Sequence, residues 1–176
     1  MKYGIYNEEL GFSNGPEFDN AFDAINDAWG KCRMHTVWEF DDDGKYVRTL
    51  SLTEQHEIWE REAAKAPAEY RVYYFPAAKL GAEQGAHEKN VGIIQPYKDI
   101  ADKFGIKWGE GTIYSFYGYM PGQKGVVAIG IHVNLFLQRP AAKAAVDWQA
   151  RATNCPCLRT FNKYHKLVCE ESYAEE

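Results

Sequence analysis

The stretch TIYSFYGYMPGQKGVVAIGIHVNLFLQ, residues 112–138, decides the fold of the second half of the chain. It holds two runs of β-branched and aromatic residues, the types that fit a pleated sheet. Pro121, Gly122 and Gly125 separate the two runs, and both residue types are typical of turns. We therefore predict a β-hairpin over residues 112–138 at the centre of a sheet.

The first 76 residues predict the element order of a ferredoxin-like unit, β-α-β-β-α-β. The first helix is opened by residues 14–17 and ends near residues 30–32, and Thr53 is the candidate cap of the second helix. The sequence DDDG at residues 41–44 is a hairpin turn signal. The strands expected from the apolar patterns are residues 2–6, 34–40, 46–52 and 70–75.

The rest of the chain predicts a second pass of the same order. Residues 77–90 lack apolar periodicity and are interpreted as a connecting loop. The elements expected after this loop are a short strand at 91–94, a helix opened by Pro96, the hairpin, a helix opened by Pro140 and a last hairpin at 158–169. We predict an α+β fold of antiparallel sheets with helices on one face. Two tandem ferredoxin-like (βαββαβ) halves, 1–76 and 91–176, and one continuous domain are the alternatives.

The composition is that of a folded globular protein, because 45% of the 176 residues are apolar and 15% are aromatic. No uninterrupted apolar run reaches about 18 residues, so no membrane span is predicted. The N-terminal residues MKYGIYNEEL lack the apolar core of a secretory signal, which makes a cytoplasmic location the expectation. A homo-oligomer stays open as an alternative to a monomer.

The net charge of −5 is unevenly distributed along the chain. Residues 1–76 carry 8 Lys and Arg against 15 Asp and Glu, whereas residues 77–176 carry 12 against 10. Direct binding of nucleic acid requires a basic face and is therefore not expected. A protein partner with a basic surface would suit the acidic half.

Carboxylates recur at helical spacing in the acidic half. Three aspartates four residues apart would form a row on the first helix, and three more lie at the predicted hairpin tip. Tyrosine is well suited to protein contact. Together these residue types make up the predicted binding surface, which consists of Asp19, Asp23, Asp27, Asp41, Asp42, Asp43, Tyr73, Tyr117 and Tyr119. The alternative interpretation is a solvated helix face and a polar turn.

Two functions of different classes follow from these patterns. The first is a non-enzymatic protein-binding module or inhibitor whose acidic surface mimics nucleic acid. Anti-defence proteins of phages and mobile elements have this general character, and the comparison is an analogy from composition. The second is a small-ligand or nucleotide binder that uses the cleft between the two halves. We assign no catalytic residue, and His132, inside an apolar strand, is interpreted as a core or edge residue.

A third hypothesis rests on the cysteines near the end of the chain. Cys155, Cys157, His165 and Cys169 supply three thiols and one imidazole, which are enough for a tetrahedral zinc site. The sequence therefore predicts zinc as a candidate cofactor and a zinc or thiol site as a further alternative. Buried thiols that behave as small apolar side chains are the competing interpretation.

Overall fold

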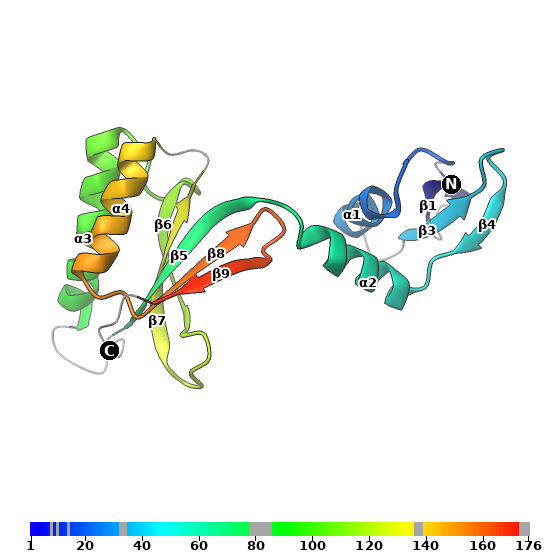
Figure 1. Cartoon of the computed structure of the whole chain (residues 1–176). Helices are drawn as coiled ribbons and strands as arrows, with labels where there is room; N and C mark the ends of the chain where they lie inside the picture. The colour runs from blue at the N-terminus through cyan, green and yellow to red at the C-terminus, as the bar shows by residue number, and fades with distance from the viewer. Residues whose placement is uncertain are drawn as a thin grey trace. The chain divides into compact units, whose positions relative to one another are not determined.

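The computed structural model of the chain describes residues 1–7, 9, 11–13, 15–31, 35–77, 86–135 and 139–172. It shows an α+β protein with two antiparallel sheets, and the predicted fold class is confirmed. The chain divides into two compact units, Met1–Lys65 and Ala66–Glu176 (Figure 1). No helix among the described residues is long and apolar enough to cross a membrane.

The first unit is one sheet with two helices. The sheet has the strand order β2-β1-β3-β4; helix α1 packs against β1 and β3, and helix α2 packs against α1. Its elements are β1 (Lys2–Asn7), β2 (Phe12–Ser13), α1 (Ala21–Lys31), β3 (His35–Phe40), β4 (Tyr46–Thr49) and α2 (Leu52–Ala63). The core of this unit consists of Ile5, Ala24, Ile25, Ala28, Val37 and Leu50.

The N-terminal cap of helix α2 is Ser51, two residues before Thr53, the cap that the sequence predicted. The Ser51 hydroxyl accepts a hydrogen bond from the backbone N–H of Glu54, and the Glu54 carboxylate accepts one from the N–H of Ser51. This reciprocal pair is a capping box. The hydrogen bond from Arg48 and those from Ser51 lower the pKa of the Glu54 carboxyl to about 2.

We expect the substitution Ser51→Ala to lower the free energy of unfolding of the first unit by about 1 kcal/mol, because a helix donor loses its partner. Chemical denaturation followed by the fluorescence of Trp29 and Trp59 would measure the change. Thr53→Ala is the matched control, and its effect should stay within about 0.5 kcal/mol. A larger loss for Thr53→Ala than for Ser51→Ala would mean that the capping assignment is wrong.

The second unit is a five-stranded antiparallel sheet with the strand order β6-β7-β5-β8-β9. Its elements are β5 (Ala68–Pro76), α3 (Ala86–Phe104), β6 (Ile113–Tyr119), β7 (Val127–Asn134), α4 (Pro140–Ala152), β8 (Cys157–Asn162) and β9 (Leu167–Glu171). Strands β6 and β7 form the predicted hairpin, with Ile113 opposite Val133 and Tyr119 opposite Val127. The hairpin lies at one side of the sheet, however, and β5 occupies the centre.

Two sequence expectations change in the second unit. Strand β5 was predicted to close the first half, but it pairs with β7 and β8, so the tandem ferredoxin-like arrangement is not confirmed. The prediction of a strand at residues 91–94 is wrong, because these residues are part of α3, which also contains Pro96. A four-residue apolar run fits either a strand or a helix, and here buried positions continue at helical spacing through Asn90, Tyr97 and Ala101. The predicted loop 77–90 overlaps this helix, and residues 78–85 lie outside the described ranges.

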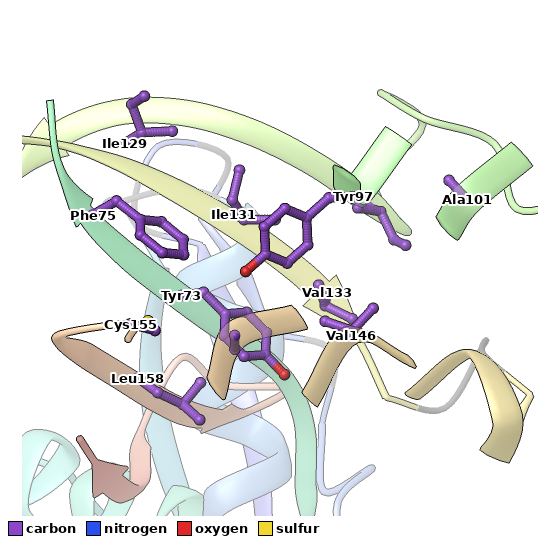
Figure 2. Close-up of a cluster of buried hydrophobic side chains, with 12 residues drawn as sticks. Tyr73, Phe75, Tyr97, Ala101, Ile129, Ile131, Val133, Val146, Cys155 and Leu158 are labelled. Carbon is purple, nitrogen blue, oxygen red and sulfur yellow. The ribbon is translucent and has the colours of Figure 1, made fainter. Parts of the chain in front are cut away.

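Helices α3 and α4 lie side by side and cover one face of the second sheet (Figure 1). Tyr97 from α3 and Val146 from α4 are packed against Tyr73 and Phe75 of β5, as Figure 2 shows. Alternate residues of a strand point to opposite faces. Every second residue of β5, β6 and β7 therefore lies on the face opposite α3 and α4.

One polar cluster joins α4 to the centre of the sheet. Asp147 Oδ1 accepts hydrogen bonds from Arg71 Nη1 at 2.6 Å and from the Tyr73 hydroxyl at 2.8 Å, and Oδ2 accepts one from Lys143 Nζ at 3.0 Å. Tyr73 is only 1% exposed. Its predicted place on a binding surface is therefore wrong, because its ring belongs to the core and its hydroxyl is bound within it.

Candidate functional site

The face of the second sheet opposite α3 and α4 carries a hollow of about 410 Å³, which we call the aromatic hollow. On this face Tyr114 is opposite His132 and Phe116 is opposite Gly130. Five aromatic rings, from β5, β6 and β8, line the hollow: Tyr70, Tyr74, Tyr114, Phe116 and Phe161. The other lining residues are Glu69, Val72, Gly111, His132, Asn134, Lys163 and His165. All of them belong to the second unit.

The rings of the aromatic hollow hold one another in place. Tyr70 stacks on Phe161 with ring centroids 5.3 Å apart, and its ring meets His132 edge to face at 4.2 Å. Tyr114 meets His132 in the same way at 4.6 Å and also contacts Phe116 at 6.2 Å. Such pairs favour fixed relative orientations. These ring contacts therefore define the shape of the hollow.

Gly130 makes room for the ring of Phe116. The two residues are directly opposite on neighbouring strands, and the Phe116 ring lies over the Gly130 backbone. A Cβ atom at position 130 would overlap three ring atoms of Phe116, closer than any real Cβ contact. Glycine is required here because of this close approach.

His132 is the central polar group of the aromatic hollow. Neither of its ring nitrogens, both buried, has a hydrogen-bond partner among the described residues. Burial, and secondarily the nearby His165, lower the pKa of His132 to about 4. The imidazole is consequently neutral at pH 7, with one N–H to donate and one lone pair to accept. An unsatisfied pair of this kind is costly unless another molecule satisfies it.

Tyr70 and His165 close one side of the hollow. The Tyr70 hydroxyl lies 2.8 Å from Nδ1 of His165, within hydrogen-bond distance. Burial, followed by the neighbouring Tyr114, Tyr74 and Glu69, raises the pKa of Tyr70 to about 12, so the phenol keeps its proton at pH 7. Backbone N–H groups of the β8–β9 turn donate to the Asn162 side chain and fix the turn that carries His165.

The expected row of aspartates is not a single helix face. Asp19 precedes α1, which begins at Ala21 and not near residue 16, and it forms an ion pair with Lys2. Asp23 accepts a hydrogen bond from the Asn20 side chain at 2.7 Å. Asp27 is partly buried. The three carboxylates therefore lie in different local surroundings, although Asp19 and Asp23 line one hollow that does not include Asp27.

Two aspartates at the hairpin tip, Asp41 and Asp42, form hydrogen bonds within the first unit. Asp41 Oδ1 accepts hydrogen bonds from the backbone N–H of Asp43 and of Lys45, at 3.1 and 2.8 Å. Asp42 accepts one from the N-terminal ammonium group at 2.5 Å. That contact lowers the pKa of the Asp42 carboxyl. These interactions are typical of a turn and a chain terminus.

The residues of the predicted zinc site are not brought together. Cys155 is buried in the core, and its thiol contacts the carbonyl oxygens of Tyr74 and Cys157 at 3.6 and 3.3 Å. Cys169 is exposed on β9, and His165 contacts Tyr70. Among the described residues, no group of three or more His, Cys, Asp or Glu side chains could hold a metal ion. Burial raises the pKa of Cys155 to about 12, as expected of a thiol that packs as a small apolar side chain.

The tyrosines that the sequence predicted for binding in the second unit do not line the aromatic hollow. Tyr117 and Tyr119 are 50% and 75% exposed, but they alternate with the residues that line the hollow and lie outside it. Tyr70 and Tyr74 do line it. The alternation in YRVYYF, residues 70–75, is the signal that could have separated these two tyrosines from the buried Tyr73.

Comparison of the chain with protein-family models, with curated proteins and with solved structures finds no match. The geometry of the site is therefore the basis for inferring its function. Within the described residues, the aromatic hollow combines several aromatic rings with a buried imidazole that has no hydrogen-bond partner, and it is therefore the candidate site.

The buried imidazole makes stability depend on pH. His132 has a pKa of about 4 in the folded chain, below the ordinary value of 6.5, so its unfolded form takes up a proton first as the pH falls. The contribution of neutral His132 to the free energy of unfolding is fully present above about pH 6.5 and is lost progressively as the pH falls from about 6.5 to about 4. We expect His132→Phe to reduce the fall in melting temperature between these pH values. His56→Gln, at an exposed histidine, should keep the wild-type fall; equal slopes for all three proteins would contradict the burial of a neutral His132.

Proposed function

We propose that the second unit binds a small, planar, largely apolar molecule in the aromatic hollow. The observation that carries the proposal is the imidazole of His132, whose buried nitrogens lack partners among the described residues while two tyrosine rings hold it in place. A flat ligand with one polar edge would satisfy one of these nitrogens once the Tyr70 or Tyr114 ring, both of which contact the imidazole, moved aside to admit it. The remaining surface of such a ligand would stack on the surrounding rings.

The size and chemistry of the aromatic hollow support this proposal. Ligand pockets typically enclose about 300–1,000 Å³ and combine apolar walls with a few polar groups. The hollow has about 410 Å³, five aromatic rings and the polar side chains of His132 and Asn134. Tyrosine rings offer large contact area at a small cost in conformational entropy.

The proposal develops the small-ligand alternative of the sequence analysis but places the site within one unit. The protein-binding module stays a prediction, which the local contacts of the acidic residues do not test.

A panel of three bicyclic aromatic molecules tests the proposal at pH 8: neutral quinoline, anionic naphthalene-2-carboxylate and cationic N-methylquinolinium. At least one should bind with a dissociation constant below about 1 mM in a calorimetric or NMR titration of the full chain. Tyr114→Ala should weaken binding about fivefold, since an aromatic contact contributes about 1 kcal/mol.

The matched control is Tyr119→Ala, which removes a tyrosine from the same strand but from outside the hollow. It should leave the dissociation constant unchanged. Absence of binding by all three molecules, or an equal loss in both variants, would overturn the proposal. Far-ultraviolet circular dichroism of each variant establishes that the fold is retained.

A further inference from the structure

We infer that the ligand of the aromatic hollow is a planar organic cation, such as a protonated or N-alkylated heteroaromatic ring. This inference rests on the proposed function and names the ligand class of the same site. It is carried by the combination of aromatic ring faces with a carboxylate that has no internal counter-ion.

The aromatic rings favour a positive charge. The faces of Tyr and Phe rings carry partial negative charge and attract cations within about 6 Å of the ring centroid. Tyr70, Tyr74, Tyr114, Phe116 and Phe161 converge on the hollow from three strands. Because the site is partly shielded from water, this attraction is larger than at an exposed position.

Glu69 supplies the formal negative charge. Glu69 is one of the residues that line the hollow, and the charge of its carboxylate contributes to the raised pKa of Tyr70. Among the described residues, the Glu69 side chain forms no ion pair, although other carboxylates of the second unit, such as Asp147 and Glu170, do. A cationic ligand would provide the missing counter-ion.

The other ionisable groups do not oppose a cation strongly. His132, the most buried of them, is neutral at pH 7 and therefore adds no positive charge to the hollow. Lys163 is exposed, and its ammonium group lies 5.0 Å from the centroid of the Tyr164 ring, which is not part of the hollow. An anionic ligand, in contrast, would meet the ring faces and the Glu69 carboxylate directly.

The test compares the affinities of N-methylquinolinium and quinoline, which have nearly the same shape and differ in charge, at pH 8. We expect the cation to bind about tenfold more tightly than quinoline. Glu69→Gln should weaken binding of the cation about fivefold and change that of quinoline less than about twofold. Glu88→Gln, at an exposed carboxylate of α3 on the helix side of the sheet, is the matched control and should change neither affinity.

The outcomes separate this inference from the proposed function. If quinoline or naphthalene-2-carboxylate binds as tightly as the cation and Tyr114→Ala still weakens that binding, the hollow is a ligand site but the inferred charge is wrong. If Glu69→Gln leaves the affinity for the cation unchanged, the assigned counter-ion is wrong and the inference is overturned. If none of the three molecules binds, both the inference and the proposed function fail.

Discussion

Replacing Asp147 by alanine is expected to lower the free energy of unfolding of the second unit by about 2–3 kcal/mol. The substitution removes the acceptor for Arg71, Tyr73 and Lys143 at once, so the buried Tyr73 hydroxyl keeps only its interaction with Arg71. Breaking a fully buried ion pair typically costs about 3–5 kcal/mol, and the expected loss is smaller because the Arg71 and Asp147 side chains are 17% and 21% exposed.

The pKa of the Asp147 carboxyl supports this expectation. Burial alone would raise it, but the hydrogen bonds from Tyr73 and Lys143 and the charge of Arg71 outweigh burial and hold the pKa below its ordinary value. Urea unfolding followed by NMR signals of Ile131 and Val133 would measure the loss. Asp102→Ala, at an exposed carboxylate of α3, is the control and should change stability by less than about 0.5 kcal/mol. A similarly small effect of Asp147→Ala would show that the cluster does not stabilise the unit.

The substitution Gly130→Ala is expected to destabilise the second unit by about 1–3 kcal/mol and to abolish ligand binding in the aromatic hollow. The added methyl group overlaps the Phe116 ring, and overpacking of this kind forces a side chain out of its preferred position. The Phe116 ring must then shift, and this shift changes the shape of the hollow. Urea unfolding and titration with the three bicyclic probes would measure the two effects.

Gly118→Ala is a matched control for Gly130→Ala. Gly118 lies on the adjacent strand, and a Cβ atom there would be 3.8 Å from the Phe116 ring, an ordinary contact. Its substitution should leave stability within about 0.5 kcal/mol and should preserve binding. If both variants behave alike, the close fit between Gly130 and Phe116 does not determine the shape of the hollow.

The sequence predicted local structure better than it predicted connections between distant segments. The hairpin of residues 112–138 and the helix opened by Pro140 follow from periodicity and turn residues, which act over a few positions. The partners of β5 could not be read in the same way, because strands that pair with it come more than 50 residues later. Periodicity also failed at residues 91–94, where the apolar run was too short to distinguish a strand from a helix.

The aromatic hollow was missed for a related reason. Its rings come from β5, β6 and β8, and only the sheet order brings Tyr70, Tyr114 and Phe161 to one place. The predicted site residues instead followed patterns visible within short segments, such as the aspartate spacing and the Cys-Pro-Cys motif. His132 was placed correctly on a strand, but its lack of hydrogen-bond partners depends on neighbours from other strands.

The most direct test of the ligand site is the set of intermolecular nuclear Overhauser effects between N-methylquinolinium and the full chain. The account predicts contacts from the ligand ring protons to Tyr114, Phe116 and Phe161, together with a shift in the ring resonances of His132. Contacts confined to Tyr117 and Tyr119 or to residues of the first unit, or no contacts at saturating ligand, would contradict it.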